Sequence, residues 1–341
     1  MELGVITVDK GTVIRPFLKW AGGKRQLLPA LRPHFPVSFN RYIEPFLGSG
    51  AVFFDLSGAG RLEKCRVELV DLNPDLIGCY RAVRDRTEAV IAALERLDAE
   101  HRERGEECYY DVRDARFNPA RAARAATTRG SDRAYTPELA AMLIYLNRTG
   151  FNGLYRLNRS GAFNVPAGRY VNPRICDADQ LRLTAAALRR PGVTLQHKPF
   201  DDALRDAGRG DFIYCDPPYA PLSPTARFAQ YTAGGFSSLD HRRLQHAIVD
   251  AARRGAVVVV SNSSAPEIEA IYTSADARRA GLRVERVAAR RAINSRAGSR
   301  GPVDELIITN APAGLHGRTR PTPKMLKVRL TPRKATRAYG S

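Results

Sequence analysis

Short apolar runs rich in β-branched residues alternate along the chain with segments of helical periodicity. These runs predict strands near Arg41–Glu44, Val67–Asp71, Val193–Lys198, Phe212–Asp216 and Val257–Ser261. Between them, helices are predicted over Pro74–Arg84, which has a proline in its first turn, and over Leu239–Arg253. This alternation is typical of an α/β fold in which a mostly parallel sheet is covered by helices on both faces.

Two parts of the chain depart from this alternation. Roughly residues 80–195 separate the second strand from the third, and a connection of that length requires a lobe of its own. The lobe begins with an amphipathic helix and ends in LNRTGFNGLYRLNRSGAFNVPAGRY, a segment whose Asn, Gly, Arg and aromatic residues are typical of a recognition surface. Later, strands predicted near Val284–Ala288 and Glu305–Thr309 flank a polar stretch, as in a hairpin that closes the edge of a sheet.

The charge balance is strongly basic. The chain carries 54 Lys and Arg against 35 Asp and Glu, a formal charge of +19 over 341 residues. A polyanionic partner would explain this excess. From composition alone, a genome-wide bias toward Arg and Ala explains it equally well, so the placement of the charges has to decide. Residues 311–341 carry eight Lys or Arg, four prolines and no acid, and we expect a mobile basic tail there.

Other features of the composition place the chain in a broad class. No apolar run approaches the length of a membrane span, and Glu2 and Asp9 stand in an N-terminal segment without the layout of a signal peptide. The five cysteines are scattered singly without a CxxC pair, which favours reduced thiols over disulfides or a zinc site. We therefore expect a soluble cytoplasmic protein that binds no metal.

The first candidate binding motif is FLGSG, Phe46–Gly50, which follows the first predicted strand and precedes a helix that begins near Ala51. Gly48 and Gly50 let the backbone approach a ligand, although a plain turn would use the same glycines. Asp71 ends the second strand 21 residues after Gly50, where a carboxylate can accept hydrogen bonds from both hydroxyls of a ribose. The loop is neither GxxxxGK[ST] nor a full GxGxxG, so the nucleoside need not carry phosphates. S-adenosylmethionine fits this description.

The most specific motif is DPPY, Asp216–Tyr219, directly after the strand FIYC. Pro217 and Pro218 fix the backbone and leave carbonyl oxygens without a neighbouring N–H. An amine held by the Asp216 carboxylate and the Pro217 carbonyl would donate both hydrogens and aim its lone pair at an incoming methyl group, while Tyr219 would stack on a planar base. A sulfonium methyl donor needs orientation and polarisation, not a covalent nucleophile or a metal. The alternative is a strand-terminating turn with a buried proline.

A third motif, FLKWAGGKRQLLP, lies ahead of the first strand at Phe17–Pro29. Gly22 and Gly23 are predicted to open a helix whose backbone N–H groups could receive the carboxylate of a cofactor. Trp20, the only tryptophan, is by position alone a core residue, and Lys19 and Lys24 are by default solvated charges.

Seven segments resemble, in the same order, the DNA adenine methylase (Dam) family, class α with a DPPY motif: KWAGGK, EPFLGSG, DLNPDLI, LNRTGFNGLYRLN, GAFNVPAGRY, CDPPYAPLSPTARFAQYTAGGF and VDELI. The resemblance runs from about Phe17 to Thr309. It implies a Rossmann-like S-adenosylmethionine-dependent methyltransferase sheet with an antiparallel last strand, double-stranded DNA as substrate and GATC as the site. Residues 1–16 would be an N-terminal extension, 17–80 and 195–312 the catalytic domain, 81–194 an inserted, mainly helical target-recognition domain, and 313–341 the tail.

The resemblance also implies roles for the residues around the cofactor. Asp216, Pro217, Pro218 and Tyr219 would hold a flipped adenine by its N6 amine and its ring. The implied cofactor contacts are Trp20, Ala21, Lys24, Glu44, Phe46, Gly48, Gly50, Asp71 and Asp216.

A further set would contact DNA. Lys19 is similar to the residue that reads the first guanine, and Arg156 to the one that reads the guanine opposite the site's cytosine. Leu154 and Pro166 would contact thymine, Phe151 and Asn152 would fill the stack, and Tyr170 is a further DNA contact. The family often has Tyr in place of Phe151, so a hydroxyl contact is lost, and an acid is common where Ala162 stands. Phosphate contacts are implied in the polar hairpin loop for Arg290, Arg291, Asn294, Ser295 and Arg300, although a solvated loop would look the same.

Three other functions stay open from the residues alone. An N4-cytosine methyltransferase would use nearly the same sheet, and DPPY does not exclude it. Protein glutamine methylases usually carry Asn in place of Asp216 and need no recognition lobe. A DNA-binding protein that has lost catalysis would keep the lobe, although Asp216, Tyr219, Asp71 and both loop glycines are present. We expect a monomer at the nucleoid, with a restriction endonuclease as a candidate genetic partner. Residues 125–135 form a segment longer than in typical relatives, for which we have no functional account.

Overall fold

A computed structural model describes residues 11–20, 24–127, 135–220, 236–289 and 303–312. Its centre is a seven-stranded sheet in the order β3-β2-β1-β4-β5-β7-β6. The strands are β1 (Arg41–Glu44), β2 (Arg66–Asp71), β3 (Val193–His197), β4 (Asp211–Cys215), β5 (Val257–Ser263), β6 (Arg283–Ala289) and β7 (Val303–Thr309). Neighbours from β3 to β5 are parallel, whereas β7 is antiparallel to both β5 and β6. The predicted fold class and the hairpin at the sheet edge are confirmed, with strand ends shifted by one or two residues.

Both faces of the sheet are buried. Adjacent residues of its strands point in opposite directions, so they enter two different hydrophobic clusters. One hydrophobic cluster contains the strand residues Tyr42, Leu69, Phe212, Val259 and Ile307. The other contains their neighbours Ile43, Val70, Ile213, Val260 and Ile308. A strand that is buried on both faces has no polar side, which is why these strands are continuous apolar runs in the sequence.

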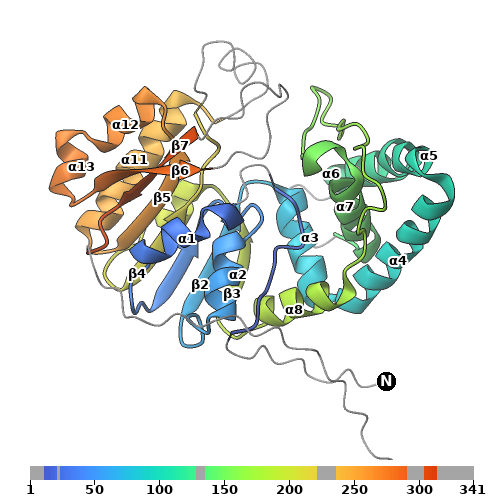
Figure 1. Ribbon diagram of the computed structural model, residues 1–341, viewed down its shortest axis with the longest axis horizontal. Coiled ribbons are helices and arrows are strands. Elements are labelled where there is room, and N and C mark those ends of the chain that lie inside the picture. The colour runs from blue at the N-terminus through green and yellow to red at the C-terminus, as the bar shows by residue number, and fades with distance from the viewer. Residues whose placement is uncertain (1–10, 21–23, 128–134, 221–235, 290–302, 313–341) are drawn as a thin grey trace, which may run out of the picture.

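Short helices cover the two faces (Figure 1). The Ile43 cluster is completed by α9 (Phe200–Leu204), α11 (Ser238–Arg253), α12 (Pro266–Tyr272) and α13 (Ala275–Arg279). The Tyr42 cluster is completed by α1 (Leu28–Leu31), α2 (Ala51–Gly58) and α3 (Pro74–Asp85), and 3₁₀ turns η1 (Lys24–Gln26) and η2 (Arg32–His34) flank α1. The starts of α3 and α11 follow from local chemistry, because the side chains of Asn73 and Ser237 accept backbone N–H groups of the first turn.

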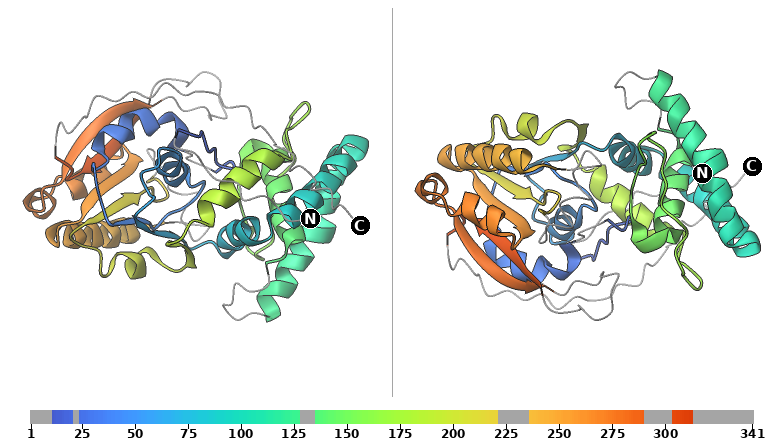
Figure 2. Two further views of the ribbon diagram at one scale, coloured as in Figure 1. Left: turned by 90° about the horizontal axis from the view of Figure 1, so that it is seen from below. Right: turned by 90° about the horizontal axis from the view of Figure 1, so that it is seen from above.

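The connection between β2 and β3 is mainly helical. It contains α4 (Thr87–Arg104), α5 (Glu106–Tyr110), the π-helix η3 (Asp111–Phe117), α6 (Asn118–Thr127), α7 (Pro137–Thr149), η5 (Phe151–Gly153) and α8 (Ala178–Leu188). Between η5 and α8 the chain is irregular and is held by isolated bridges that pair Gly150 with Ala167 and Leu157 with Phe163. Helices α4 to α7 gather at the end of the molecule opposite β6 (Figures 1 and 2).

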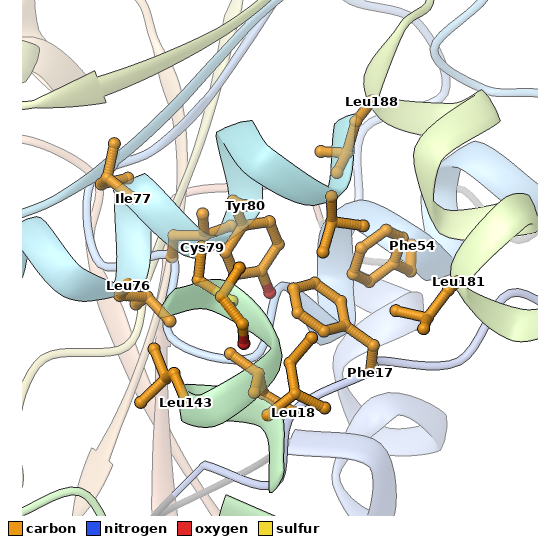
Figure 3. Close-up of a cluster of buried hydrophobic side chains, with 14 of the residues drawn as sticks. Phe17, Leu18, Phe54, Leu76, Ile77, Cys79, Tyr80, Leu143, Leu181 and Leu188 are labelled. Carbon is orange, nitrogen blue, oxygen red and sulfur yellow. The ribbon is translucent and has the colours of Figure 1, made fainter. Parts of the chain in front are cut away.

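These helices share one core with the sheet. Side chains from the segment ahead of β1, from α2, α3, α7 and α8 converge on one cluster, seen in Figure 3 as Phe17, Leu18, Phe54, Tyr80, Leu143 and Leu181. Close packing of this kind transmits small displacements between the elements it joins. The domain boundaries at residues 80 and 195 stay a prediction. Among the helices that the structure describes, none is both long and apolar enough to cross a membrane.

Candidate functional site

Three carboxylic acids stand at the carboxyl ends of three neighbouring strands. Asp71 ends β2, Glu44 ends β1 and Asp216 follows β4. Because these strands are adjacent and parallel, their ends meet at one edge of the sheet. The strand order reverses at β1, and such a switch point is where open α/β sheets bind ligands. We call these three residues the strand-end site.

Burial dominates the electrostatics of the strand-end site. Glu44 is 2% exposed, and burial raises its pKa well above the usual range, with the charges of Asp216 and Asp71 adding to the effect. Burial also raises the pKa of Asp71, and it raises the pKa of Asp216 to about 6. The amino ends of the same strands differ, because there Arg41 pairs with Asp211 at 2.6 Å. Acids with raised pKa values gathered in one place are typical of a functional site.

Lys24 lies directly against the DPPY motif. Its Nζ is 3.1 Å from Asp216 Oδ1 and 4.1 Å from the centroid of the Tyr219 ring. Ser261 of β5 donates its hydroxyl to the same Asp216 Oδ1 at 3.0 Å. Both contacts lower the pKa of Asp216 against the burial that raises it. Lys24 is 5% exposed, so its interpretation as a solvated charge is wrong.

Tyr219 is fixed by an acid on β7. Its hydroxyl donates to Glu305 Oε2 at 2.8 Å, and Lys24 Nζ lies 3.9 Å from the same oxygen. Pro217 is buried and Pro218 is exposed. The turn is therefore anchored from two strands, by Ser261 of β5 and by Glu305 of β7.

The loop after β1 needs glycine at two positions. Gly48 and Gly50 have φ angles of +47° and +65°, a region that disfavours other residues. A Cβ at Gly48 would lie 3.0 Å from Trp20 Cδ1, so the indole ring lies against this loop. The Gly48 N–H donates to Asp71 Oδ2 at 3.0 Å, and the Asn73 N–H donates to Asp71 Oδ1 at 2.9 Å. Each oxygen of Asp71 keeps lone-pair capacity, which fits an acceptor for the two hydroxyls of a ribose.

The remaining members of the predicted cofactor set lie in different surroundings. The Trp20 ring stacks on Tyr155, with centroids 5.7 Å apart. Phe46 packs against Phe200 at 5.5 Å and Phe236 at 5.7 Å, in the cluster on the other face of the sheet. Ala21, and with it the glycine pair at 22–23, lies outside the described residues.

The predicted DNA contacts within the described residues are Lys19 and six residues between 151 and 170, and we call this set the loop surface: Lys19, Phe151, Asn152, Leu154, Arg156, Pro166 and Tyr170. Asn147 of α7 connects Lys19 to the loop that contains Gly153. Its side chain accepts a hydrogen bond from the Lys19 N–H at 2.8 Å and donates to the carbonyls of Lys19 at 2.7 Å and Gly153 at 2.8 Å. Lys19 Nζ lies 4.1 Å from the centroid of the Tyr170 ring. A Cβ at Gly153 would lie 2.5 Å from Lys19 Cβ, so only glycine permits this approach.

The other side chains of the loop surface are presented to solvent in fixed positions. Arg156 is exposed, and its guanidinium donates to Asn164 Oδ1 at 2.8 Å and to the Asn164 carbonyl at 3.1 Å. Phe151 is 46% exposed, and its N–H donates to the carbonyl of Pro166 at 2.9 Å. Asn152 adopts a φ of +53°, which Asn tolerates better than most residues. The predicted phosphate contacts Arg290, Arg291, Asn294, Ser295 and Arg300 lie outside the described residues.

Sequence reasoning missed three residues of this arrangement, namely Ser261, Glu305 and Asn147. Two of them carried a signal. Ser261–Ser263 is a fully buried polar run at the end of an apolar strand, and Glu305 is an acid within the apolar strand β7. Buried polar groups need partners, so a polar residue in such a strand indicates a contact at the strand end. Asn147 lies in a helix where Asn is unremarkable in the sequence.

Comparison with known proteins gives matches over most of the chain. Residues 20–292 match the model of the D12 class N6 adenine-specific DNA methyltransferase family. The chain is 37% identical over 301 residues to the Type II methyltransferase M1.LlaDCHI of Lactococcus lactis subsp. cremoris, which covers 87% of this chain and 95% of that protein. It is 35% identical to the Type II methyltransferase M.MjaIII of Methanocaldococcus jannaschii, over 87% and 99% of the two chains. It is 34% identical to the DNA adenine methylase of Escherichia coli K12, over 87% and 96%.

Proposed function

Because the chain belongs to the D12 class N6 adenine-specific DNA methyltransferases, we propose that it transfers a methyl group from S-adenosylmethionine to N6 of adenine within GATC in double-stranded DNA. The adenine would be flipped out of the duplex into the strand-end site. One observation carries this proposal. The ammonium of Lys24 lies 3.1 Å from Asp216 and 4.1 Å from the Tyr219 ring, so this turn can hold an N–H donor against its carboxylate and its aromatic face together, as a stacked base amine would require.

The DPPY turn would act by holding the target amine. Asp216 and the carbonyl of Pro217 would accept hydrogen bonds from the two N–H groups of the N6 amine. The lone pair of the nitrogen would then point out of the plane of the base. Tyr219 would cover the ring, and its orientation is set by the bond from its hydroxyl to Glu305. S-adenosylmethionine supplies a methyl group that needs no further activation, so orientation and exclusion of water are the contributions that the protein makes.

The residues beside this turn would hold the cofactor. Asp71 would accept the ribose hydroxyls, since the N–H groups of Gly48 and Asn73 already fix its carboxylate. Gly48 and Gly50, both in the left-handed conformation, would let the loop backbone lie close to a ligand. The indole ring of Trp20 packs against this loop and would border the ligand. Glu44 is buried beside these residues, and its Oε2 already accepts the Tyr42 hydroxyl at 2.8 Å, which fixes this carboxyl group at the end of β1.

The loop surface would read the DNA, and residues 81–194 would form the target-recognition domain. Lys19 would contact the guanine of GATC, and Arg156 would contact the guanine opposite its cytosine. The guanidinium of Arg156 is oriented by its hydrogen bonds to Asn164. Phe151 is exposed and its backbone N–H bonds the Pro166 carbonyl, which suits an aromatic side chain that would fill the gap left by a flipped base. An enzyme of this kind works on duplex DNA, and the net charge of +19 supports binding to that polyanion.

The proposal is tested by expressing the chain in a host that lacks N6-methyladenine and by sequencing the host DNA with detection of modified bases. We expect N6-methyladenine in GATC on both strands. The variant Asp216→Ala, expressed to the same level, should leave the DNA unmodified. N4-methylcytosine, or N6-methyladenine confined to another motif, would contradict the proposal.

A further inference from the structure

Tyr155 connects the loop surface to the residues proposed to hold the cofactor. It stands in the chain between Leu154 and Arg156. Its ring stacks on Trp20 with a centroid distance of 5.7 Å and an angle of 24° between the planes, and it packs on Phe163 at 5.8 Å. Trp20 in turn lies against the loop at Gly48. The side chain of Tyr155 therefore connects the segment of Leu154 and Arg156 to Trp20, which contacts the loop at Gly48.

The hydroxyl of Tyr155 makes a second connection to the same side of the molecule. It donates to Asp75 Oδ2 at 2.5 Å. Asp75 is 1% exposed and lies in the first turn of α3, four residues after Asp71. Arg121 of α6 also donates to Asp75 Oδ2, and it donates to the carbonyl of Gly161 at 2.5 Å. A buried carboxylate is stable only with such partners, so Asp75 holds Tyr155 and Arg121 in a defined arrangement.

The two connections have different chemistry and lie at opposite ends of the same side chain. Packing alone would be satisfied by an apolar residue beside Trp20 and Phe163, but it would leave Asp75 with one donor fewer. Conversely, a polar residue that bonds Asp75 would not cover the indole ring. Tyrosine meets both requirements, and a movement of Trp20 or of the start of α3 therefore acts directly on the residue that stands between Leu154 and Arg156.

We propose that Tyr155 is a positioning residue that couples occupancy of the cofactor loop to recognition of base pairs by Leu154 and Arg156. The inference rests on the proposed function of these two groups. A ligand beside Gly48 that fixes Trp20 also fixes the ring of Tyr155. The positions of Leu154 and Arg156, its two neighbours in the chain, are then restricted as well. Because coupling between two binding sites is reciprocal, cognate DNA must tighten the binding of the cofactor by the same factor.

The coupling is measured as the dissociation constant of a GATC duplex with and without saturating S-adenosylhomocysteine. In the parent chain we expect the ligand to tighten binding of the GATC duplex by about fivefold or more, within the usual range for coupled sites, and to leave a scrambled duplex unaffected. In Tyr155→Leu the ratio for the GATC duplex should fall to near one. Tyr155→Phe keeps the stack but loses the bond to Asp75, so it should give an intermediate ratio.

Trp20 supplies a direct readout, because it is the only tryptophan of the chain. Adding the GATC duplex to the parent chain should change the tryptophan fluorescence, and the change should be absent or reversed in sign in Tyr155→Leu. A matched control is Tyr110→Leu in α5, whose ring packs on Tyr109 and Arg113 and not in the Trp20 stack. This control should keep both the coupling ratio and the fluorescence change.

The outcomes separate this inference from the proposed function. A parent ratio of one, or an unchanged ratio in Tyr155→Leu, would overturn the coupling role while adenine methylation by the parent chain leaves the proposed function standing. Failure of the parent chain to methylate adenine would count against the proposed function instead. If Tyr155→Leu does not fold, Tyr155→Phe decides, and a ratio equal to that of the parent would overturn the proposal, which requires both the ring and the hydroxyl of Tyr155.

Discussion

Lys24 should set the pH range over which the enzyme works. Burial raises the pKa of Asp216 to about 6, and it does so although Lys24 and Ser261 lower it. Asp216 acts purely as a hydrogen-bond acceptor for a target amine only when it is ionised, because its protonated form carries an O–H donor. Since the raised pKa means that protonation begins in mildly acidic solution, kcat/KM for DNA should fall as the pH drops through about 6. The profile of kcat/KM reports the free enzyme, which is the state whose geometry is described above.

The variant Lys24→Met tests this reasoning. An opposite charge within hydrogen-bonding distance lowers the pKa of a carboxyl group by about 1–3 units, so its removal should move the acidic midpoint upward by about that amount. For a shift of about 2 units, kcat/KM near pH 7 drops by roughly tenfold and recovers as the pH is raised. Transfer of tritiated methyl groups to a GATC duplex at saturating S-adenosylmethionine gives the profile.

Two controls accompany this measurement. Ser261→Ala removes a hydrogen bond to the same oxygen and should shift the midpoint upward by less. Lys198→Met removes a lysine that pairs with Glu68 at 3.7 Å, away from Asp216, and should leave the midpoint in place. A midpoint that does not move in Lys24→Met, or a loss of activity that alkaline pH does not restore, would refute the role of this ion pair.

Three further variants test other parts of the site. Tyr219→Phe keeps the ring but removes the hydrogen-bond donor to buried Glu305, so the free energy of unfolding in urea should fall by about 1.5–3 kcal/mol. No change would mean that this bond does not anchor the turn. Gly50→Ala forces a side chain into a left-handed conformation, so it should lower the free energy of unfolding by about 1–2 kcal/mol and weaken S-adenosylmethionine binding in calorimetry. Gly161→Ala, with open space around its Cβ, should leave that binding unchanged. Arg156→Ala should lose about 1–3 kcal/mol of discrimination at one base pair in duplex competition, and equal weakening on GATC and scrambled DNA would disprove base reading.

The strands and the DPPY turn could be predicted because their signals are local. A strand buried on both faces must be continuously apolar, and a double proline must end it, so the end of β4 was located to within one residue. The helix starts at Asn73 and Ser237 likewise follow from side chains that bond their own first turn.

The contacts that orient the site could not be predicted because they join distant parts of the chain. Tyr219 and Glu305 are 86 residues apart, and they meet only because β7 pairs with β5 in antiparallel register. Lys19 and Asn147 are 128 residues apart, and their bond depends on how α7 packs beneath the segment ahead of β1. Lys24 is the clearest case, since nothing in its local sequence indicates that its ammonium lies buried against Asp216.

Methylation of adenine at N6 by the Asp216 turn is detected by chromatography of nucleosides. A duplex with one GATC site is incubated with S-adenosylmethionine and the parent chain or Asp216→Ala, then digested to nucleosides and analysed by mass spectrometry. We predict N6-methyldeoxyadenosine as the product of the parent chain, and none from Asp216→Ala at equal DNA binding. N6-methyldeoxyadenosine formed by Asp216→Ala would rule out the role of Asp216, and methyldeoxycytidine formed by the parent chain would rule out adenine as the target base.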